Sequence, residues 1–282
     1  MKNVILLLVC ISFIQFSKAQ KNNQAIYAEV SGKGQPVLFI PGFTVPGEVW
    51  KPIVKDLEKN YECHVITLAG FGGKAPIDFP WLPKVNTALK TYILDNDLKN
   101  TTIIGHSLGG TVATWLASQD DLNLKKIILV DALPAAGALM IPDYSPDKLA
   151  YDSPYNNQQL AMDDNGFMQV ADAMSKGMSI DTLAQEKIKN WIIASDRKTY
   201  VYGYTDYLKL DIREGLKDIT IPATIIAAEK PYGKEMATQT YKIQYQNLKN
   251  YDFIIAESSA HFVMLDQPEW FSKQIQTILS SK

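Results

Sequence analysis

The chain has 282 residues, 46% of them hydrophobic and 21% charged, a composition typical of a globular protein with one large α/β domain or two smaller ones. The 28 Lys and Arg residues nearly balance the 30 Asp and Glu residues, and no basic run exceeds two residues, which argues against a nucleic-acid-binding face. Three histidines and two cysteines, scattered along the chain, are too few ligands for a zinc site, whereas a carboxylate metal site is compatible with the composition.

The N-terminus has the pattern of a secretory signal peptide. Lys2 precedes an apolar stretch from Val4 to Phe16, which is followed by the small residues Ser17 and Ala19. We therefore expect residues 1–19 to be removed and the remaining chain to be exported, to the periplasm or out of the cell. The apolar stretch is too short for a membrane-spanning helix, which needs about 20 residues, so we expect no stable membrane anchor.

Cleavage after Ala19 would leave Cys63 as the single cysteine, so no intramolecular disulfide is expected even in an oxidising compartment. Cys63 lies in the apolar run Tyr61–Leu68, and this position predicts a buried strand thiol rather than a reactive one.

Short apolar runs rich in Val and Ile recur along the chain and do not alternate with polar residues. They are Val37–Ile40, His64–Leu68, Thr101–Ile104, Ile127–Val130, Ala223–Ala228 and Tyr251–Ile255. Such runs are typical of strands covered on both faces. Helix-like stretches lie between them, at Trp50–Asn60, Leu82–Asp95, Gly110–Ser118, Lys234–Leu248 and Pro268–Leu279. This alternation predicts an α/β fold with a mostly parallel central sheet and helices on both faces.

One segment interrupts the alternation. From about Leu133 to Lys217 no comparable strand run occurs, and helical spacing dominates. We interpret residues 134–217 as a helical cap inserted between the sixth and seventh strands, with residues 20–133 and 218–282 forming the core. A second independent domain is the alternative, but residues 218–282 complete the first pattern. The aromatic and methionine side chains of this segment are explained either by helix packing or by an apolar pocket.

Residues 101–118 carry the clearest chemical motif. A β-branched run leads into Gly105-His106-Ser107-Leu108-Gly109, and a helix follows at once. This is the G-x-S-x-G pattern in its strand–turn–helix context, in which a strained turn holds the serine hydroxyl out at the end of the strand. The N–H groups at the start of the helix point to the same place, where negative charge develops during acyl transfer. Ser107 is therefore the candidate nucleophile.

A serine hydroxyl needs a base near neutral pH, and imidazole is the obvious side chain. His106 adjoins Ser107, but its side chain should point away, so we expect it to pack or to orient the loop. His64 begins a predicted buried strand and is most simply structural. His261 lies in the loop between the last strand and the last helix, at the same sheet edge as Ser107. We therefore predict His261 as the base.

At this point the sequence resembles the α/β-hydrolases, in particular the capped, esterase-like group, over residues 25–282. Besides the serine motif, the resemblance lies in Phe39-Ile40-Pro41-Gly42-Phe43 after an early strand, in the glycine-rich Leu68–Gly73, and in the stretch from His261 to Pro268-Glu269. It implies that the backbone N–H groups of Phe43 and Leu108 form the oxyanion hole. Pro41 replaces the family's usual histidine and leaves the backbone donor intact.

The acid of the triad is where the chain departs from the family. The family usually places an Asp after the seventh strand, where this sequence has Pro231, two residues after Glu229. Some members carry the acid after the sixth strand, and there the chain has Asp131. An Asp at the end of a buried strand needs a partner, which favours Asp131 over Glu229.

These features predict a secreted serine hydrolase that cleaves a small carboxylic ester through Ser107, His261 and Asp131, without a cofactor. A lactonase, an amidase or a C–C bond hydrolase would use the same triad, and a non-catalytic binding protein on the same scaffold is a further alternative. The natural substrate and the oligomeric state are not predicted.

Overall fold

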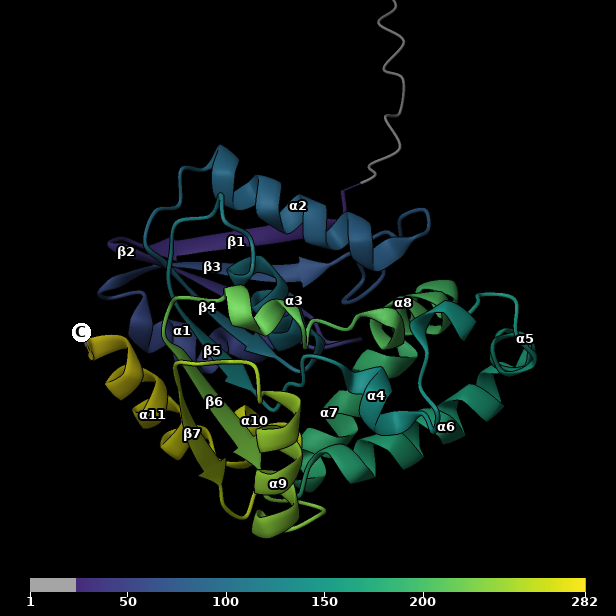
Figure 1. Ribbon diagram of the computed structural model, residues 1–282. Coiled ribbons are helices and arrows are strands. Elements are labelled where there is room, and N and C mark those ends of the chain that lie inside the picture. Colours follow the sequence, from purple (N-terminus) through teal and green to yellow (C-terminus); the bar gives the residue numbers. More distant parts are fainter. Residues whose placement is uncertain (1–23, 282) are drawn as a thin grey trace, which may run out of the picture.

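The computed structural model describes residues 24–281, so the predicted signal peptide lies outside the described residues. A seven-stranded sheet forms the centre of the molecule, with the strand order β1-β3-β2-β4-β5-β6-β7 (Figure 1). The strands are β1 (Ile26–Gly32), β2 (Gln35–Ile40), β3 (Tyr61–Leu68), β4 (Thr101–His106), β5 (Leu124–Val130), β6 (Ala223–Ala228) and β7 (Tyr251–Ala256). β1 pairs antiparallel with β3, and all other pairs are parallel. The predicted mostly parallel sheet is confirmed.

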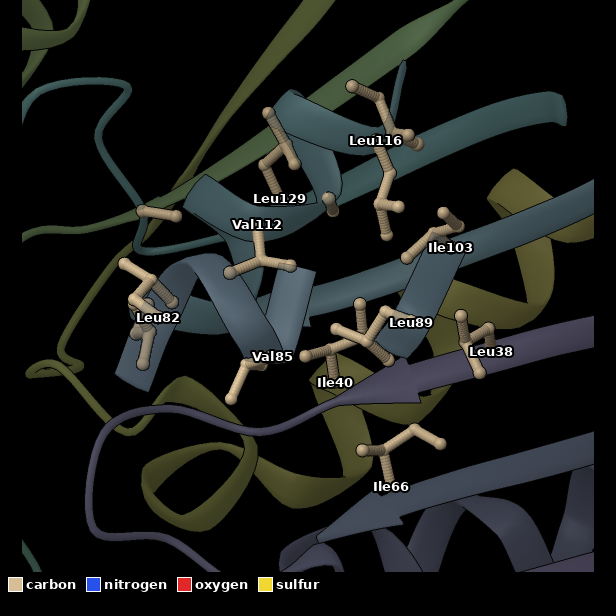
Figure 2. Packing of buried hydrophobic residues seen from close by; sticks show 14 of the residues in the cluster. Leu38, Ile40, Ile66, Leu82, Val85, Leu89, Ile103, Val112, Leu116 and Leu129 are labelled. Carbon is tan, nitrogen blue, oxygen red and sulfur yellow. The ribbon is translucent and has the colours of Figure 1, made fainter. Parts of the chain in front are cut away.

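Helices cover both faces of the sheet. One face packs against α2 (Trp81–Asp95), α3 (Leu108–Ala117) and α9 (Lys234–Gln244), and the other against α1 (Lys51–Leu57), α10 (Val263–Asp266) and α11 (Pro268–Ser280). Successive strand residues point to opposite faces, so Leu38 belongs to the first core and its neighbour Phe39 to the second. Figure 2 shows Leu38, Ile40 and Ile103 of the sheet packed against side chains of α2 and α3.

Strand β1 was not among the apolar runs, and the reason is its place in the sheet. It lies at the edge, and only its first residue, Ile26, is buried. An edge strand needs little apolar side chain, so a search for continuous apolar runs misses it. β6, by contrast, has neighbours on both sides and is buried at every position.

The segment between β5 and β6 is helical, as predicted. It lies between the fifth and sixth strands of this seven-stranded sheet, whereas the sequence analysis placed it between the sixth and seventh. Its α-helices are α4 (Ala136–Met140), α5 (Pro154–Ala161), α6 (Asp164–Met178), α7 (Thr182–Ile193) and α8 (Tyr204–Lys209). The side chains of Ser153, Asp163 and Asp181 each accept a backbone N–H at the start of α5, α6 and α7. In Figure 1 these helices gather beyond the C-terminal ends of the strands.

Two other expectations concern single features. Cys63 is a buried free thiol, as predicted, and burial followed by the charge of Glu58 raises its pKa to about 12. Phe167 and Trp191 of the cap are buried in helix packing, whereas Tyr155 is exposed. Across residues 24–281, no helix is both long enough and apolar enough to span a membrane.

Candidate active site

Ser107 occupies the single-residue turn between β4 and α3. Its φ of 53° and ψ of −123° lie in a region that side chains rarely adopt. The flanking glycines make this turn possible, because a Cβ on Gly105 would lie 2.3 Å from the carbonyl oxygen of Gly109. A Cβ on Gly109 would lie 2.2 Å from the carbonyl oxygen of Ile40. The motif therefore reflects close backbone packing on both sides of the serine.

Asp131 and His261 meet at the same edge of the sheet. Asp131 follows β5, His261 lies in the loop after β7, and His261 Nδ1 is 2.6 Å from Asp131 Oδ2. The other carboxylate oxygen, Oδ1, accepts the backbone N–H of Ala228 at 2.8 Å and the hydroxyl of Tyr241 at 2.9 Å. The structure thus brings together two of the residues predicted for the triad.

The contacts of Asp131 keep it ionised. Burial by itself raises the pKa of this carboxyl, but the hydrogen bond and charge of His261, the N–H of Ala228 and the hydroxyl of Tyr241 together hold the pKa below its ordinary value. A carboxylate can only accept, so Nδ1 of His261 carries a proton and donates it. In the neutral ring the lone pair is then on Nε2, the nitrogen that can act as a base.

The residue before Ser107, His106, holds the main chain of His261 in place. His106 Nε2 donates to the carbonyl oxygen of His261 at 2.9 Å, and the two rings lie 4.6 Å apart. Burial, followed by the positive charge of His261, lowers the pKa of His106 to about 3. His106 is therefore a neutral donor that orients the loop, in agreement with the sequence expectation.

The same loop is fixed from the cap. Asp266 Oδ2 accepts the N–H of Ala260 at 2.7 Å, while Oδ1 accepts the N–H of Ile180 at 3.1 Å and the hydroxyl of Ser179. The N–H of Phe262 also donates to the carbonyl oxygen of Met178 at 3.0 Å. The residues on either side of His261 are thus tied to the connection between α6 and α7.

The remaining candidates have different surroundings. His64 lies 2.8 Å from Glu62 Oε1 through one ring nitrogen and 2.8 Å from the Tyr92 hydroxyl through the other, which is a structural arrangement on β3. Glu229 Oε2 accepts the N–H of Ser258 at 2.7 Å, so this carboxylate braces the loop instead of contacting the His261 ring.

The loop that carries Phe43 lies against the serine. A Cβ on Gly42 would be 3.2 Å from Ser107 Cβ and 2.8 Å from His106 Nδ1. Leu108 is the first residue of α3, and its N–H therefore has no carbonyl one turn earlier to bond with. Both predicted oxyanion donors thus belong to backbone adjoining Ser107.

Aromatic side chains gather around the ring of Phe43. Its centroid lies 4.9 Å from Phe71, 6.0 Å from Trp81 and 5.4 Å from Tyr204, so core and cap rings meet there. Burial raises the pKa of Tyr207 on α8, and the nearby side chains of Thr111 and Ser107 only partly offset this effect. Aromatic side chains from the core and from the cap therefore meet at Phe43, on the loop that adjoins Ser107.

Sequence reasoning named Tyr207 only as one of the aromatic residues of the cap, and it missed Tyr241. Tyr241 lies on α9, far along the chain from Asp131, and a tyrosine that packs looks the same in the sequence as one that reaches a carboxylate. Within the described part of the chain, no group of three or more His, Cys, Asp or Glu residues is arranged to bind a metal ion.

Comparison with known proteins gives one consistent picture. The sequence model of the "Alpha/beta hydrolase family" matches residues 37–274 of this chain. Pimeloyl-(acyl-carrier protein) methyl ester esterase of Vibrio cholerae is 24% identical over 257 residues, covering 89% of this chain and 96% of the relative. The protein of the same name from Legionella pneumophila strain Paris is 24% identical over 251 residues, covering 87% and 95%.

Solved structures share the fold. An enol-lactonase from Burkholderia xenovorans superposes with a TM-score of 0.76 at 14% identity, covering 91% of this chain and 96% of its own. An esterase from Exiguobacterium antarcticum gives 0.75 at 20% identity, with the same coverage. The chain belongs to the alpha/beta hydrolase family and is an esterase-like hydrolase.

Proposed function

We propose that this protein is a serine hydrolase that cleaves a carboxylic ester through an acyl-enzyme formed on Ser107, with His261 as the base and Asp131 as the orienting acid. The observation that carries the proposal is the 2.6 Å contact between His261 Nδ1 and Asp131 Oδ2 at the sheet edge where the strained serine turn lies. The relatives that this chain matches over almost their whole length are named as esterases, and this supports a carboxylic ester as the bond that is cleaved.

In the proposed reaction, the proton of the Ser107 hydroxyl passes to Nε2 of His261 as Oγ attacks the ester carbonyl carbon. The N–H groups of Phe43 and Leu108 stabilise the resulting oxyanion. The intermediate collapses, the carbon–oxygen bond to the alcohol breaks, and Nε2 returns the proton to the leaving oxygen. Water, deprotonated by the same nitrogen, then releases the acid and restores Ser107.

The substrate is proposed at the level of a class. The aromatic rings around Phe43 favour an uncharged, apolar acyl group next to the carbonyl. The relatives are named for a methyl ester, which favours a small leaving alcohol. Lactones, amides and carbon–carbon bonds are substrates that the same triad could cleave, and a panel of these compounds beside simple esters would discriminate among them.

The test is turnover of activated aryl esters with short to medium acyl chains. The protein lacking residues 1–19 should hydrolyse them, and Ser107→Ala should abolish the activity. Ser118→Ala, which removes a hydroxyl at the far end of α3, is the matched control and should keep it. Activity in Ser107→Ala within tenfold of the parent would overturn the assignment.

Export is proposed separately, on the signal-peptide pattern of residues 1–19. Expression of the full chain followed by fractionation should give a product that begins at Gln20 outside the cytoplasm. A product that keeps Met1 and stays in the cytoplasm would contradict export and leave the proposed chemistry untouched.

A further inference from the structure

The hydroxyl of Tyr241 reaches the acid of the proposed triad from outside the three triad segments. Tyr241 lies on α9, its side chain is 7% exposed, and its hydroxyl donates to Asp131 Oδ1 at 2.9 Å. Its ring stacks on Tyr245 at 6.1 Å and 7°, and packs against Phe253 at 5.7 Å. The neighbouring rings therefore fix the direction in which the hydroxyl points.

Asp131 depends on such support. Its φ of 44° is in the left-handed region, and it directly follows the buried strand β5. Oδ1 accepts hydrogen bonds from the Ala228 N–H and the Tyr241 hydroxyl, so Oδ2 is the oxygen that contacts His261. Ala228 offers a main-chain donor, so Tyr241 is the side chain that, through Oδ1, sets the orientation of the carboxylate.

We propose that Tyr241 is a positioning residue for the Asp131–His261 pair, holding the carboxylate so that Oδ2 receives the proton on His261 Nδ1. The inference rests on the proposed triad and adds a fourth side chain to it. It also gives Tyr241 an electrostatic effect, because a hydroxyl that donates to Oδ1 draws negative charge away from Oδ2.

The effect has a definite sign. Without the hydroxyl, more negative charge stays on Oδ2, the oxygen that faces the imidazole, so the protonated ring is favoured. As the pH is lowered, the variant should therefore lose activity at a higher pH than the parent protein does. Burial raises the pKa of Tyr207, Tyr241 and Tyr245, and burial lowers the pKa of His106 to about 3. None of these four groups therefore changes charge near neutral pH. The titratable groups that bond to Asp131 are His261 and Tyr241, whereas His106, Tyr207 and Tyr245 lie near enough to feel its charge but do not bond to its carboxylate.

The test compares Tyr241→Phe with Tyr245→Phe. Tyr245 is the matched control, because it is also buried and stacks on Tyr241, but its hydroxyl donates to the carbonyl oxygen of Ala132 at 2.9 Å. Tyr241→Phe should lower kcat on an aryl ester about threefold to tenfold, the value of one hydrogen bond, with KM within twofold. It should also move the acid limb of the rate profile up by about 0.5 pH unit. Tyr245→Phe should leave that limb in place, whatever it does to thermal stability.

A double-mutant cycle separates positioning from general packing. If Tyr241 acts through the carboxylate, Tyr241→Phe should cost less than twofold in kcat when Asp131 is already Asn. The same cost in both backgrounds, or an acid limb that moves equally in Tyr241→Phe and Tyr245→Phe, would overturn the proposal.

A readout that needs no turnover keeps the two proposals distinguishable. Histidine labelled with ¹³C reports the titration of the His261 ring by NMR, and its midpoint should move to higher pH in Tyr241→Phe. If the parent protein hydrolyses esters and the midpoint stays in place, the role of Tyr241 is wrong and the hydrolase assignment stands. If the parent hydrolyses none of the panel and the midpoint moves, the proposed function fails while the coupling of Tyr241 to Asp131 and His261 holds.

Discussion

Position 231 holds a proline where the family usually has its acid, and the carboxylate that contacts His261 comes from Asp131. β5 and β6 are parallel neighbours, so their C-terminal ends lie side by side and either could deliver a carboxylate to the same histidine. The resemblance to the family narrowed the acid to Asp131 and Glu229, and the sequence favoured Asp131 because an Asp at the end of a buried strand needs a partner. The contact itself could not be predicted, because it depends on which carboxylate the loop after β7 meets.

The two carboxylates should differ sharply in their effect on the rate. Asp131→Asn removes the acceptor that holds the reactive tautomer of His261, and we expect kcat to fall at least ~10²-fold. Glu229→Gln keeps an oxygen that can accept from Ser258, and the loss should be less than ~tenfold. Steady-state kinetics on both variants, with folding checked by circular dichroism, makes the comparison. The reverse ranking would move the acid to the loop after β6.

The rate of the parent protein should rise with pH through about 6–8, because the imidazole must be neutral to accept the serine proton. The lowered pKa of Asp131 keeps that carboxylate ionised across this range, so a single limb is expected. His261→Ala should abolish the activity, whereas His64→Ala, which removes the Glu62 and Tyr92 contacts, should keep it. A folded but inactive His64→Ala variant would show that the base was assigned to the wrong histidine.

A third prediction at the residue scale concerns His106 and the stability of the fold. Its folded-state pKa, about 3, is below the unfolded value of 6.5, so the unfolded chain binds the extra proton between these limits. Its contribution to stability is full above about pH 6.5 and falls toward pH 3 by up to about 1.4 kcal/mol per pH unit. His106→Gln keeps an amide donor without a titrating ring, and its free energy of unfolding by urea should fall less steeply between pH 6.5 and 4.5. Equal slopes in parent and variant would contradict a buried neutral His106.

At the scale of elements, the strand–turn–helix around Ser107 could be predicted because the requirement is local: two glycines two residues away from the serine. The connection between the cap and the histidine loop could not. The Asp266 carboxylate accepts hydrogen bonds from the N–H of Ala260, six residues away, and from the N–H of Ile180, 86 residues away. No periodicity in the sequence relates these positions. The helical character of the cap segment was predictable, whereas the points at which it is attached to the histidine loop were not.

Loosening that connection should slow the reaction. Asp266→Asn leaves one acceptor oxygen in place of two, so either the Ala260 side or the Ile180 side loses its partner. We expect kcat to fall about threefold to thirtyfold, and hydrogen exchange to speed up at residues 178–181 and 258–262. Glu269→Gln, an exposed carboxylate on the following helix, is the control and should change neither. Unchanged exchange in Asp266→Asn would mean that the main-chain bond between Phe262 and Met178 holds the loop without the carboxylate.

For the whole molecule, the mostly parallel sheet followed from buried strands such as β4 and β6, in which every side chain is covered and the apolar signal is unbroken. β1 escaped because an exposed edge strand lacks that signal. The cap was predictable as an interruption of the pattern, but the meeting of its Tyr204 with Phe43 next to the serine depends on tertiary packing alone.

The central claim is that Ser107 is a nucleophile activated by His261. The most direct measurement is reaction with a fluorophosphonate, followed by intact mass and peptide mapping. We predict one adduct per chain on the peptide that carries Ser107, none in Ser107→Ala, and markedly slower labelling in His261→Ala. A parent protein that stays unlabelled at neutral pH, or an adduct on any other residue, would contradict the account.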